Sequence, residues 1–458
     1  MQPLTLLIAL AGSALIGFLR PVPALCVYCA ALFWYPANLT IKIGRVDFPA
    51  ARILILVFLL KIVFRTGLVR RLKWDRLDTF VLLAFVGRSL ALVTNAGFSR
   101  VLETEGGAFF DRILPYLAVR LVVSSRSDVL AFFKGIFLTA APLALVGAYE
   151  SATGNNPMGF LQVYDAWGET SLRVLSRHGF YRASVSFLGN YIPFGLLFAA
   201  LAPLSLGLLD QKVWPRPVVL VCCGVMILGG LSSMSSAPIF AMSVAFAMVA
   251  SFRFRHAWRL ALTFGVICAV FLEFYSSRHF YEVPTRFAFS TATAYYRIGL
   301  IREALGGGMT GHWLAGYGYV GVGVGADNTN FHWEHQDLVN MYVGILATSG
   351  LLGLAPYLVL NYLYYKRLYQ AAKRGRDRDD WWLVWCVAAT LVGWNTAMMT
   401  VAPLGQIRTF LYILIGVCCA LPRAVARPAA APAPVRWAAP HTSQAGRADQ
   451  LSPGGSRP

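Results

Sequence analysis

Charged side chains are scarce in this chain. They make up 13% of its 458 residues, against about 25% in a typical soluble domain. Apolar runs of about 20 residues, the length that crosses a bilayer, recur along the sequence. Backbone groups inside lipid must be hydrogen-bonded within the protein, and the short alternating segments of a barrel do not occur here. The composition therefore excludes an ordinary soluble domain and predicts an all-α, polytopic transmembrane helical bundle.

Acidic side chains are the scarcer of the two charged classes. The chain has 21 Asp and Glu against 40 Lys and Arg, a formal net charge of +19. In a soluble protein this excess would suggest nucleic acid, but the sequence has no nucleic-acid motif. The cations lie mainly in short loops between apolar runs, which is the positive-inside pattern of helical membrane proteins. We therefore expect contact with membrane lipids and no nucleic-acid partner.

Redox and disulfide signatures are also missing. Cys26 and Cys29 have CxxC spacing, but no second ligand pair exists, and all eight cysteines lie in apolar segments. They are expected to pack as small hydrophobic residues. No internal repeat is evident either, so the inverted-repeat class of transporter gains no support.

Thirteen apolar intervals are candidate spans, and twelve is nearly as good a count because the first two are short and the fifth contains arginine. The intervals are 4–19, 22–36, 49–64, 77–95, 106–124, 128–149, 187–209, 216–232, 236–252, 259–276, 338–362, 382–402 and 408–422. Basic residues concentrate in the loops 65–76, 253–259 and 366–378. With thirteen spans these loops share one side, which the positive-inside rule makes cytoplasmic. The longer loops 150–186 and 277–337 then lie outside.

The chain divides into four parts by composition. Residues 1–276 are transmembrane helices with the smaller outer loop 150–186. Residues 277–337 are a large, partly helical outer loop, and residues 338–423 are the C-terminal transmembrane helices. Residues 424–458 are rich in Ala, Pro, Ser and Gly and are predicted to be a disordered tail. The first apolar run lacks a basic n-region and a small-residue cleavage site, so we expect it to be retained.

Three features of the large outer loop could carry chemistry, and the first is Arg297. The apolar residues at 298, 301 and 305 have helical spacing, which predicts an amphipathic helix on the outer surface. Its guanidinium could grip a diphosphate through two parallel hydrogen bonds. The alternative is an arginine that reaches to the phosphate of an interfacial lipid.

The second feature is a glycine-rich turn, 314–319. Gly316 and Gly318 would let the backbone bend sharply and approach a ligand closely. Tyr317 and Tyr319 could stack on sugar rings. The turn is not a dinucleotide fingerprint, because no strand precedes it.

The third feature is a polar segment that leads into a span. Histidine is the side chain best suited to accept a proton near neutral pH. A zinc site would need a spacing such as HExxH, which this segment does not have. The alternative is a polar cap at the membrane interface. The residues concerned are His332, Glu334, His335, Asp337, Asn340 and Tyr342.

Together these features resemble the bacterial O-antigen ligase and O-antigen polymerase superfamily of membrane glycosyltransferases. The matching residues are Arg297, Gly316, Gly318, Asn340, Tyr342, Gly350 and Gly353, with weaker likeness at 149–156, 181–184 and 233–237. Two positions depart from the family pattern. Val339 stands where the family has histidine before Asn340, and Ser236 stands where it often has arginine.

The resemblance implies transfer of an undecaprenyl-diphosphate-linked oligosaccharide to an acceptor hydroxyl at the periplasmic face of the bacterial inner membrane. The acceptor would be another lipid-linked glycan or lipid A core, and no cofactor or metal would be needed. Arg297 would hold the diphosphate, and His335 would act as the base, with Glu334 and Asp337 as substitutes. The expected substrate-binding residues are Arg182, Arg302, Gly316, Gly318, Tyr317, His332, Asn340 and Tyr342.

Two other classes stay open. A transporter or flippase would carry ionisable residues in the middle of its spans. A docking subunit of an envelope complex would use the large loop as a binding surface. Formation of a new glycosidic bond separates the enzyme from both. The ionisable residues relevant to transport are Arg88, Arg112, Arg120, Lys134 and Glu273.

Overall fold

The computed structural model describes the chain between residues 2 and 426, with gaps. The described residues are 2–43, 46–65, 67–96, 98–164, 175–187, 190–276, 279, 282–289, 291–305, 309–318, 340–375, 377–402 and 405–426. They all belong to one compact unit, Met1–Ala426. The predicted tail from residue 427 onward and residues 319–339 of the predicted outer loop lie outside the described residues.

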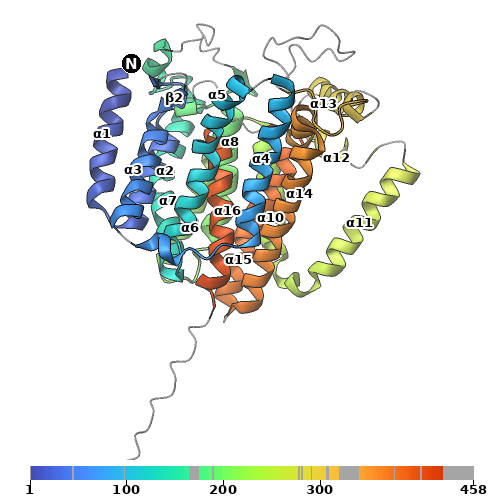
Figure 1. Cartoon of the computed structure of the whole chain (residues 1–458). Coiled ribbons are helices and arrows are strands. Elements are labelled where there is room, and N and C mark those ends of the chain that lie inside the picture. The colour runs from blue at the N-terminus through green and yellow to red at the C-terminus, as the bar shows by residue number, and fades with distance from the viewer. Residues whose placement is uncertain are drawn as a thin grey trace, which may run out of the picture. The chain divides into compact units, whose positions relative to one another are not determined.

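The first half of the chain forms helices that run up and down beside one another (Figure 1). Local sequence sets their ends. The longest of them starts at a capping box, in which Ser125 and Asp128 bond each other's backbone N–H, and it stops at Gly154, which adopts the left-handed conformation. The elements are α1 (Gln2–Phe18), α2 (Pro21–Trp34), β1 (Thr40–Ile43), β2 (Val46–Pro49), α3 (Ala50–Arg65), η1 (Leu68–Arg71), α4 (Arg76–Ala96), α5 (Phe98–Ala108), the π-helix η2 (Phe109–Ile113), α6 (Leu114–Val122), α7 (Arg126–Thr153) and η3 (Gly159–Tyr164).

The second half continues the bundle and adds the elements of the large loop. The elements are β3 (Ser176–Arg177), β4 (Phe180–Tyr181), η4 (Val185–Phe187), α8 (Tyr191–Leu206), α9 (Arg216–Ser232), α10 (Ser236–Ala250), η5 (Ser251–Ala257), α11 (Trp258–Tyr275), α12 (Glu282–Thr285), α13 (Thr291–Glu303), α14 (Met341–Arg374), α15 (Arg378–Met398) and α16 (Gln406–Ala424).

The predicted helical bundle is confirmed, and its apolar helices indicate a membrane protein. Each of the thirteen predicted intervals contains a helix. Five of the described helices are long and apolar enough to cross a membrane by themselves, and the other apolar helices are shorter. The number of spans therefore stays a prediction. The five are Arg76–Asn95, Arg126–Thr153, Ser236–Ala257, Met341–Arg374 and Gln406–Ala424.

The centre of the bundle is α16. It packs against α14, α6, α7 and α8, and its side chains are almost all buried, including Phe410 and Tyr412. In contrast, α11 leaves the bundle after η5 (Figure 1). Its apolar side chains are exposed, with Phe264 at 66% and Phe274 at 78%, which suits a helix that faces lipid rather than protein.

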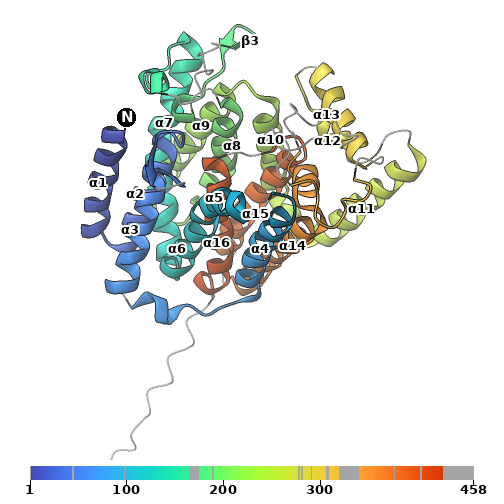
Figure 2. The ribbon, with the colours of Figure 1, turned by 45° about the horizontal axis from the view of Figure 1, so that its top comes forward.

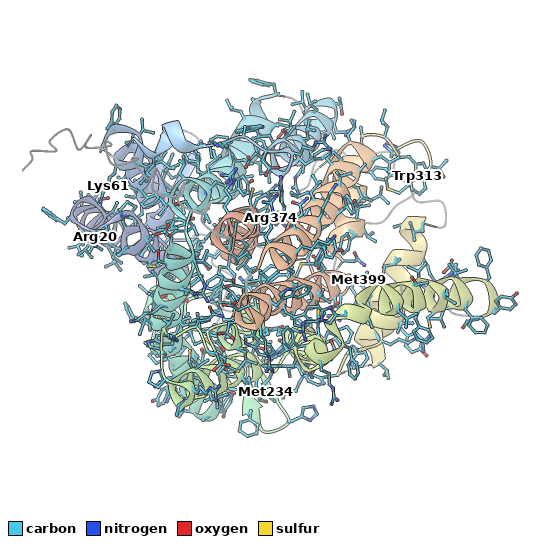
Figure 3. All side chains as sticks on the ribbon, turned by 90° about the horizontal axis from the view of Figure 1, so that it is seen from below. Arg20, Lys61, Met234, Trp313, Arg374 and Met399 are labelled. Carbon is cyan, nitrogen blue, oxygen red and sulfur yellow. The ribbon has the colours of Figure 1, made fainter. Side chains whose placement is uncertain are left out.

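The basic loops that follow α3, α10 and α14 lie together at the lower end of the bundle in Figure 1, which we call the basic end. Figure 3 is viewed from this end, where Arg374 of α14 is labelled. Arg367 of α14 forms an ion pair with Asp75, before α4. Arg255 of η5 lies 5.9 Å from the ring centroid of Trp381 in α15. These contacts join the three loops, and the opposite end of the helices is called the far end below.

Two small hairpins were missed by the sequence prediction. β1 pairs with β2, and β3 pairs with β4, both antiparallel. Thr40–Ile43 has three β-branched residues, Val46–Pro49 contains Val46 and Phe48, and only two residues separate the strands, which is a hairpin signal. Both hairpins are far shorter than the helices around them, so the neighbouring apolar runs determined the prediction and the hairpins were overlooked.

Candidate functional site

The two predicted outer loops meet at the far end of the bundle, where Figure 2 shows both β3 and α13. The guanidinium of Arg177 lies 5.3 Å from the ring centroid of Phe289, and the ring of His178 lies 6.0 Å from it. Phe287 stacks on Phe240 of α10 at 4.2 Å. The contacts place residues from the loop after α7 beside residues from the loop after α11.

Arg182 is held at the turn between α9 and α10. Its Nη2 donates to Ser235 Oγ at 2.8 Å, and its guanidinium lies 3.1 Å from the ring centroid of Tyr191. Its Nε is buried without a hydrogen-bond partner among the described residues. Burial lowers the pKa of Arg182 to about 10. An arginine therefore does lie at this turn. It is Arg182, from the loop before α8, and not residue 236, which is serine.

Glu150, at the end of α7, fixes the backbone beside Arg182. Its Oε2 accepts hydrogen bonds from the N–H groups of Ser184 at 3.0 Å and Val185 at 2.7 Å. The carboxylate is only 5% exposed. Val185 has a φ of 45°, which a β-branched residue rarely adopts. The hydrogen bonds to the Glu150 carboxylate hold Ser184 and Val185 in a backbone conformation that the local sequence alone does not favour.

Arg297 lies on the buried face of α13, together with Ala294, Ile298 and Ile301. It is 6% exposed, and its Nε and Nη1 are buried without a hydrogen-bond partner among the described residues. Burial lowers its pKa from the ordinary arginine value. The predicted helix is present, and the Arg297 guanidinium is buried within the protein. An unsatisfied buried cation is costly unless a ligand completes it.

Arg302 has a partner inside the protein. Its Nε and Nη2 bond Glu282 Oε1 at 2.7 and 2.6 Å. Glu282 is fully buried and also lies 3.8 Å from Arg286. The pair joins α12 to α13, so Arg302 helps to hold the loop together. Its side chain is 54% exposed, and its role in substrate binding stays a prediction.

The predicted glycine turn packs against a break in α14. The break is at Gly350, whose φ and ψ are 56° and −156°. A broken helix leaves backbone groups unpaired, and the segment 313–318 bonds several of them. Tyr317 N donates to Ala347 O at 2.7 Å, Gly318 N to Thr348 O at 3.0 Å, Leu351 N to Trp313 O at 2.8 Å and Leu352 N to Leu314 O at 3.1 Å. We call this contact the glycine seam.

Two glycines are required at the seam for steric reasons. A Cβ on Gly316, which has a φ of +69°, would lie 2.6 Å from Ala347 O, and a Cβ on Gly350 would lie 2.3 Å from Leu314 O. Both neighbours are backbone atoms, which cannot rotate away. Gly316 and Gly350 therefore serve a close approach of two backbone segments, whereas a Cβ on Gly318 would lie 2.8 Å from Asn95 Cβ. The approach of Gly316 and Gly318 to a sugar stays a prediction.

Gly316→Ala and Gly350→Ala are each expected to destabilise the protein by about 1–3 kcal/mol, since a Cβ in these backbone conformations is strained. The thermal unfolding midpoint of the detergent-purified protein measures this. Gly299→Ala is the matched control, because a Cβ at this helical position meets open space and alanine favours a helix. Equal midpoints for Gly350→Ala and Gly299→Ala would contradict the role of the seam.

Three further predicted binding residues, Tyr317, Asn340 and Tyr342, each contact other protein groups. Tyr317 stacks on His312 at 4.0 Å, so one face of its ring is covered. Asn340 caps α14: its Oδ1 accepts from Tyr342 N at 3.0 Å, and its Nδ2 donates to Met399 O at 2.8 Å. Tyr342 is half-buried, 6.1 Å from the ring of Tyr357. Asn340 thus organises backbone, while Tyr342 faces the interior of the bundle.

The structure brings some of the predicted site residues together around the first turns of α14. Ile301 of α13 and Ala304, the residue after α13, form one apolar cluster with Val343 and Ala347, against which Tyr317 packs. The segments that carry Arg297 and Tyr317 thus share a neighbour. Four predicted residues lie outside the described residues, and they are His332, Glu334, His335 and Asp337. Within the described ranges, no group of three or more His, Cys, Asp or Glu side chains could hold a metal.

No protein-family model and no curated protein matches this chain. The family resemblance therefore depends on the motif residues alone.

Proposed function

We propose that the chain is a membrane glycosyltransferase of the O-antigen ligase or polymerase type. It would transfer an oligosaccharide from undecaprenyl diphosphate to an acceptor sugar hydroxyl at the periplasmic face of the inner membrane. The observation that supports this best is Arg297, a buried guanidinium with open Nε and Nη1 donors in the motif position that the resemblance gives to the diphosphate grip.

The chemistry needs few groups. The acceptor oxygen attacks the anomeric carbon, the bond from that carbon to the diphosphate oxygen breaks, and undecaprenyl diphosphate leaves with the bonding electrons. Arg297 donates to the leaving diphosphate, whose charge grows in the transition state. The acceptor proton passes to a base, for which His335 is the proposed residue and Glu334 and Asp337 are substitutes. Arg182 offers a second cation at the far end, beside Ser235.

The test is turnover by the purified protein in lipid nanodiscs. Lipid-linked oligosaccharide is supplied together with an acceptor, and products are separated by size and identified by mass spectrometry. Lengthened glycan, with release of undecaprenyl diphosphate in equal amount, supports the proposal. Absence of both products with either acceptor, lipid-linked glycan or lipid A core, would overturn it.

A transporter or flippase of lipid-linked glycan is the second candidate, and one observation favours it. Arg88 of α4 and Arg112 of η2 lie within the bundle and share Glu105 as an ion-pair partner. Charged side chains inside membrane spans often mark a substrate pathway. Movement of labelled lipid-linked glycan across a liposome membrane, with no change in its length, would support transport over transfer.

A further inference from the structure

The short helix η5 lies at the basic end, where α10 ends and α11 begins. It is a 3-10 helix, in which side chains three residues apart lie on the same face. Phe252 and Arg255 are therefore neighbours. The guanidinium carbon of Arg255 is 4.7 Å from the ring centroid of Phe252 and 5.9 Å from that of Trp381 in α15. Arg255 thus contacts one aromatic ring from its own helix and one from a neighbouring helix.

Two further tryptophans of α15 fix the position of η5. The indole N–H groups of Trp382 and Trp385 each donate to a backbone carbonyl, at 2.6 and 2.7 Å. The ring of Phe252 packs edge-to-face on Trp382, with the centroids 5.0 Å apart. The helix η5 is therefore packed on α15, and Arg255 is held at a defined place on an aromatic surface.

Arg255 has no acidic partner among the described residues. Its Nε is buried and makes no hydrogen bond to any of them, while the side chain as a whole is partly exposed. The carboxylate of Asp380, next to Trp381 in sequence, pairs with Arg126 at 3.2 Å. The chain has no Asp or Glu between residues 251 and 272. A guanidinium has five donors, so one that makes only ring contacts can still bind an anion.

An apolar surface follows directly after this cation. Helix α11 leaves the bundle after η5 (Figure 1), and its Leu260 and Phe264 are 72% and 66% exposed. The two residues are four positions apart, so they lie on the same side of the helix. Tryptophan is enriched at the level of the lipid headgroups, which places Arg255 beside Trp381 at that level. A cation at headgroup level with an exposed apolar helix beside it complements a lipid whose headgroup is an anion.

We propose that Arg255, the rings of Phe252 and Trp381, and the adjoining part of α11 form a binding site for an anionic phospholipid at the basic end. The guanidinium can pair with two phosphate oxygens through its edge while its face stays on the rings. The acyl chains would lie along the exposed apolar side chains of α11. Basic pockets between transmembrane helices bind lipid headgroups in this way. The inference does not depend on glycan transfer or on Arg297.

Lipid binding to the detergent-purified, delipidated full chain tests the site. The protein is titrated with phosphatidylglycerol, phosphatidylcholine or glycerol 3-phosphate, and the bound molecules are counted by native mass spectrometry. We expect saturable binding of phosphatidylglycerol that is tighter than that of phosphatidylcholine, which has no net charge. Arg255→Gln should weaken phosphatidylglycerol binding by about 10- to 100-fold, the range expected for loss of a charged hydrogen bond. Arg255→Lys keeps the charge but loses the planar fork, so it should weaken binding less.

Arg216→Gln is the matched control. Arg216 begins α9, and its pair with Asp210 is exposed to solvent. The loop before α9 lies at the same end as η5, since Gln211 donates to Asp379 O at the start of α15. The variant therefore removes the same charge at the same end without touching η5, and it should leave phosphatidylglycerol affinity unchanged.

The thermal unfolding midpoint of each variant shows whether the fold is kept, and Arg255→Lys carries the comparison if Arg255→Gln does not fold. Equal affinity for phosphatidylglycerol and phosphatidylcholine would overturn the proposal. So would wild-type affinity in a folded Arg255 variant, or an equal loss in Arg216→Gln, which would mean a general attraction to positive charge. Glycerol 3-phosphate that binds as tightly as phosphatidylglycerol would assign Arg255 to a soluble phosphate instead of a lipid.

Discussion

Arg297→Ala is expected to lower the rate of glycan transfer by about 10²- to 10³-fold, the effect of removing one preorganised donor from a charge that develops in the transition state. Two features of Arg297 support so large an effect. It is buried, so water cannot replace the guanidinium, and its Nε and Nη1 make no hydrogen bond to any described residue. The measurement is the turnover rate of the purified variant in nanodiscs at saturating lipid-linked oligosaccharide.

The same variant should keep its fold, because its truncation breaks no described bond of Nε or Nη1 and places alanine in a helix. Arg297→Lys separates charge from geometry: it keeps one positive charge but loses the planar fork, so we expect partial activity. Arg286→Ala is the matched control in the same loop, because its pair with Glu282 is long, at 3.8 Å. Wild-type turnover in a folded Arg297→Ala protein would remove Arg297 from the site.

The sequence predicted the helices well where charged loops end an apolar run. The interval 259–276 corresponds to α11, Trp258–Tyr275, and 77–95 corresponds to α4. The predicted span 338–362 covers only part of α14, which continues for twelve more residues to Arg374. Beyond 362 the helix becomes polar, and Arg367 pairs with Asp75 at the basic end. Hydropathy reports contact with lipid, whereas a helix continues as long as its backbone bonds and side-chain partners allow.

The sequence predicted which side chains could form a site, but not their surroundings. Helical spacing placed Arg297 on α13 correctly, yet the same spacing fits a surface helix and a buried one. Gly316 was assigned to ligand approach because glycine permits close contact with any group. In the structure it lies against the backbone of Ala347, Ser349 and Gly350, more than thirty positions away along the chain. Contacts of that kind depend on tertiary packing.

The ion pairs of Glu105 show the same limit in another form. Arg88 and Arg112 were noticed as charges within spans, but Glu105 was not connected with them. The three residues come from α4, η2 and α5 and have no common motif. A charge within a predicted span was the available signal, and it identifies single residues rather than their partners.

Asp78→Ala is expected to destabilise the protein by about 3–5 kcal/mol, the cost of leaving a buried charge without its partner. Asp78 accepts hydrogen bonds from Arg120 Nε at 2.8 Å and from Arg120 Nη2 at 2.9 Å, and it also bonds the Tyr116 hydroxyl. The side chains of Asp78 and Arg120 are each 1% exposed. The pair joins α4 to α6 at the basic end. The unfolding midpoint of the purified variant measures the loss.

A double variant shows whether the stranded charge is the cause. Asp78→Leu with Arg120→Met replaces the pair by apolar side chains, and such replacements are often neutral or stabilising. We therefore expect the double variant to be clearly more stable than Asp78→Ala. Asp210→Asn is the control, since its pair with Arg216 is exposed to solvent, exposed pairs contribute little, and asparagine tolerates the φ of 63° at this position. A double variant no more stable than Asp78→Ala would mean that the geometry of the pair, rather than its charge, holds α4 and α6 together.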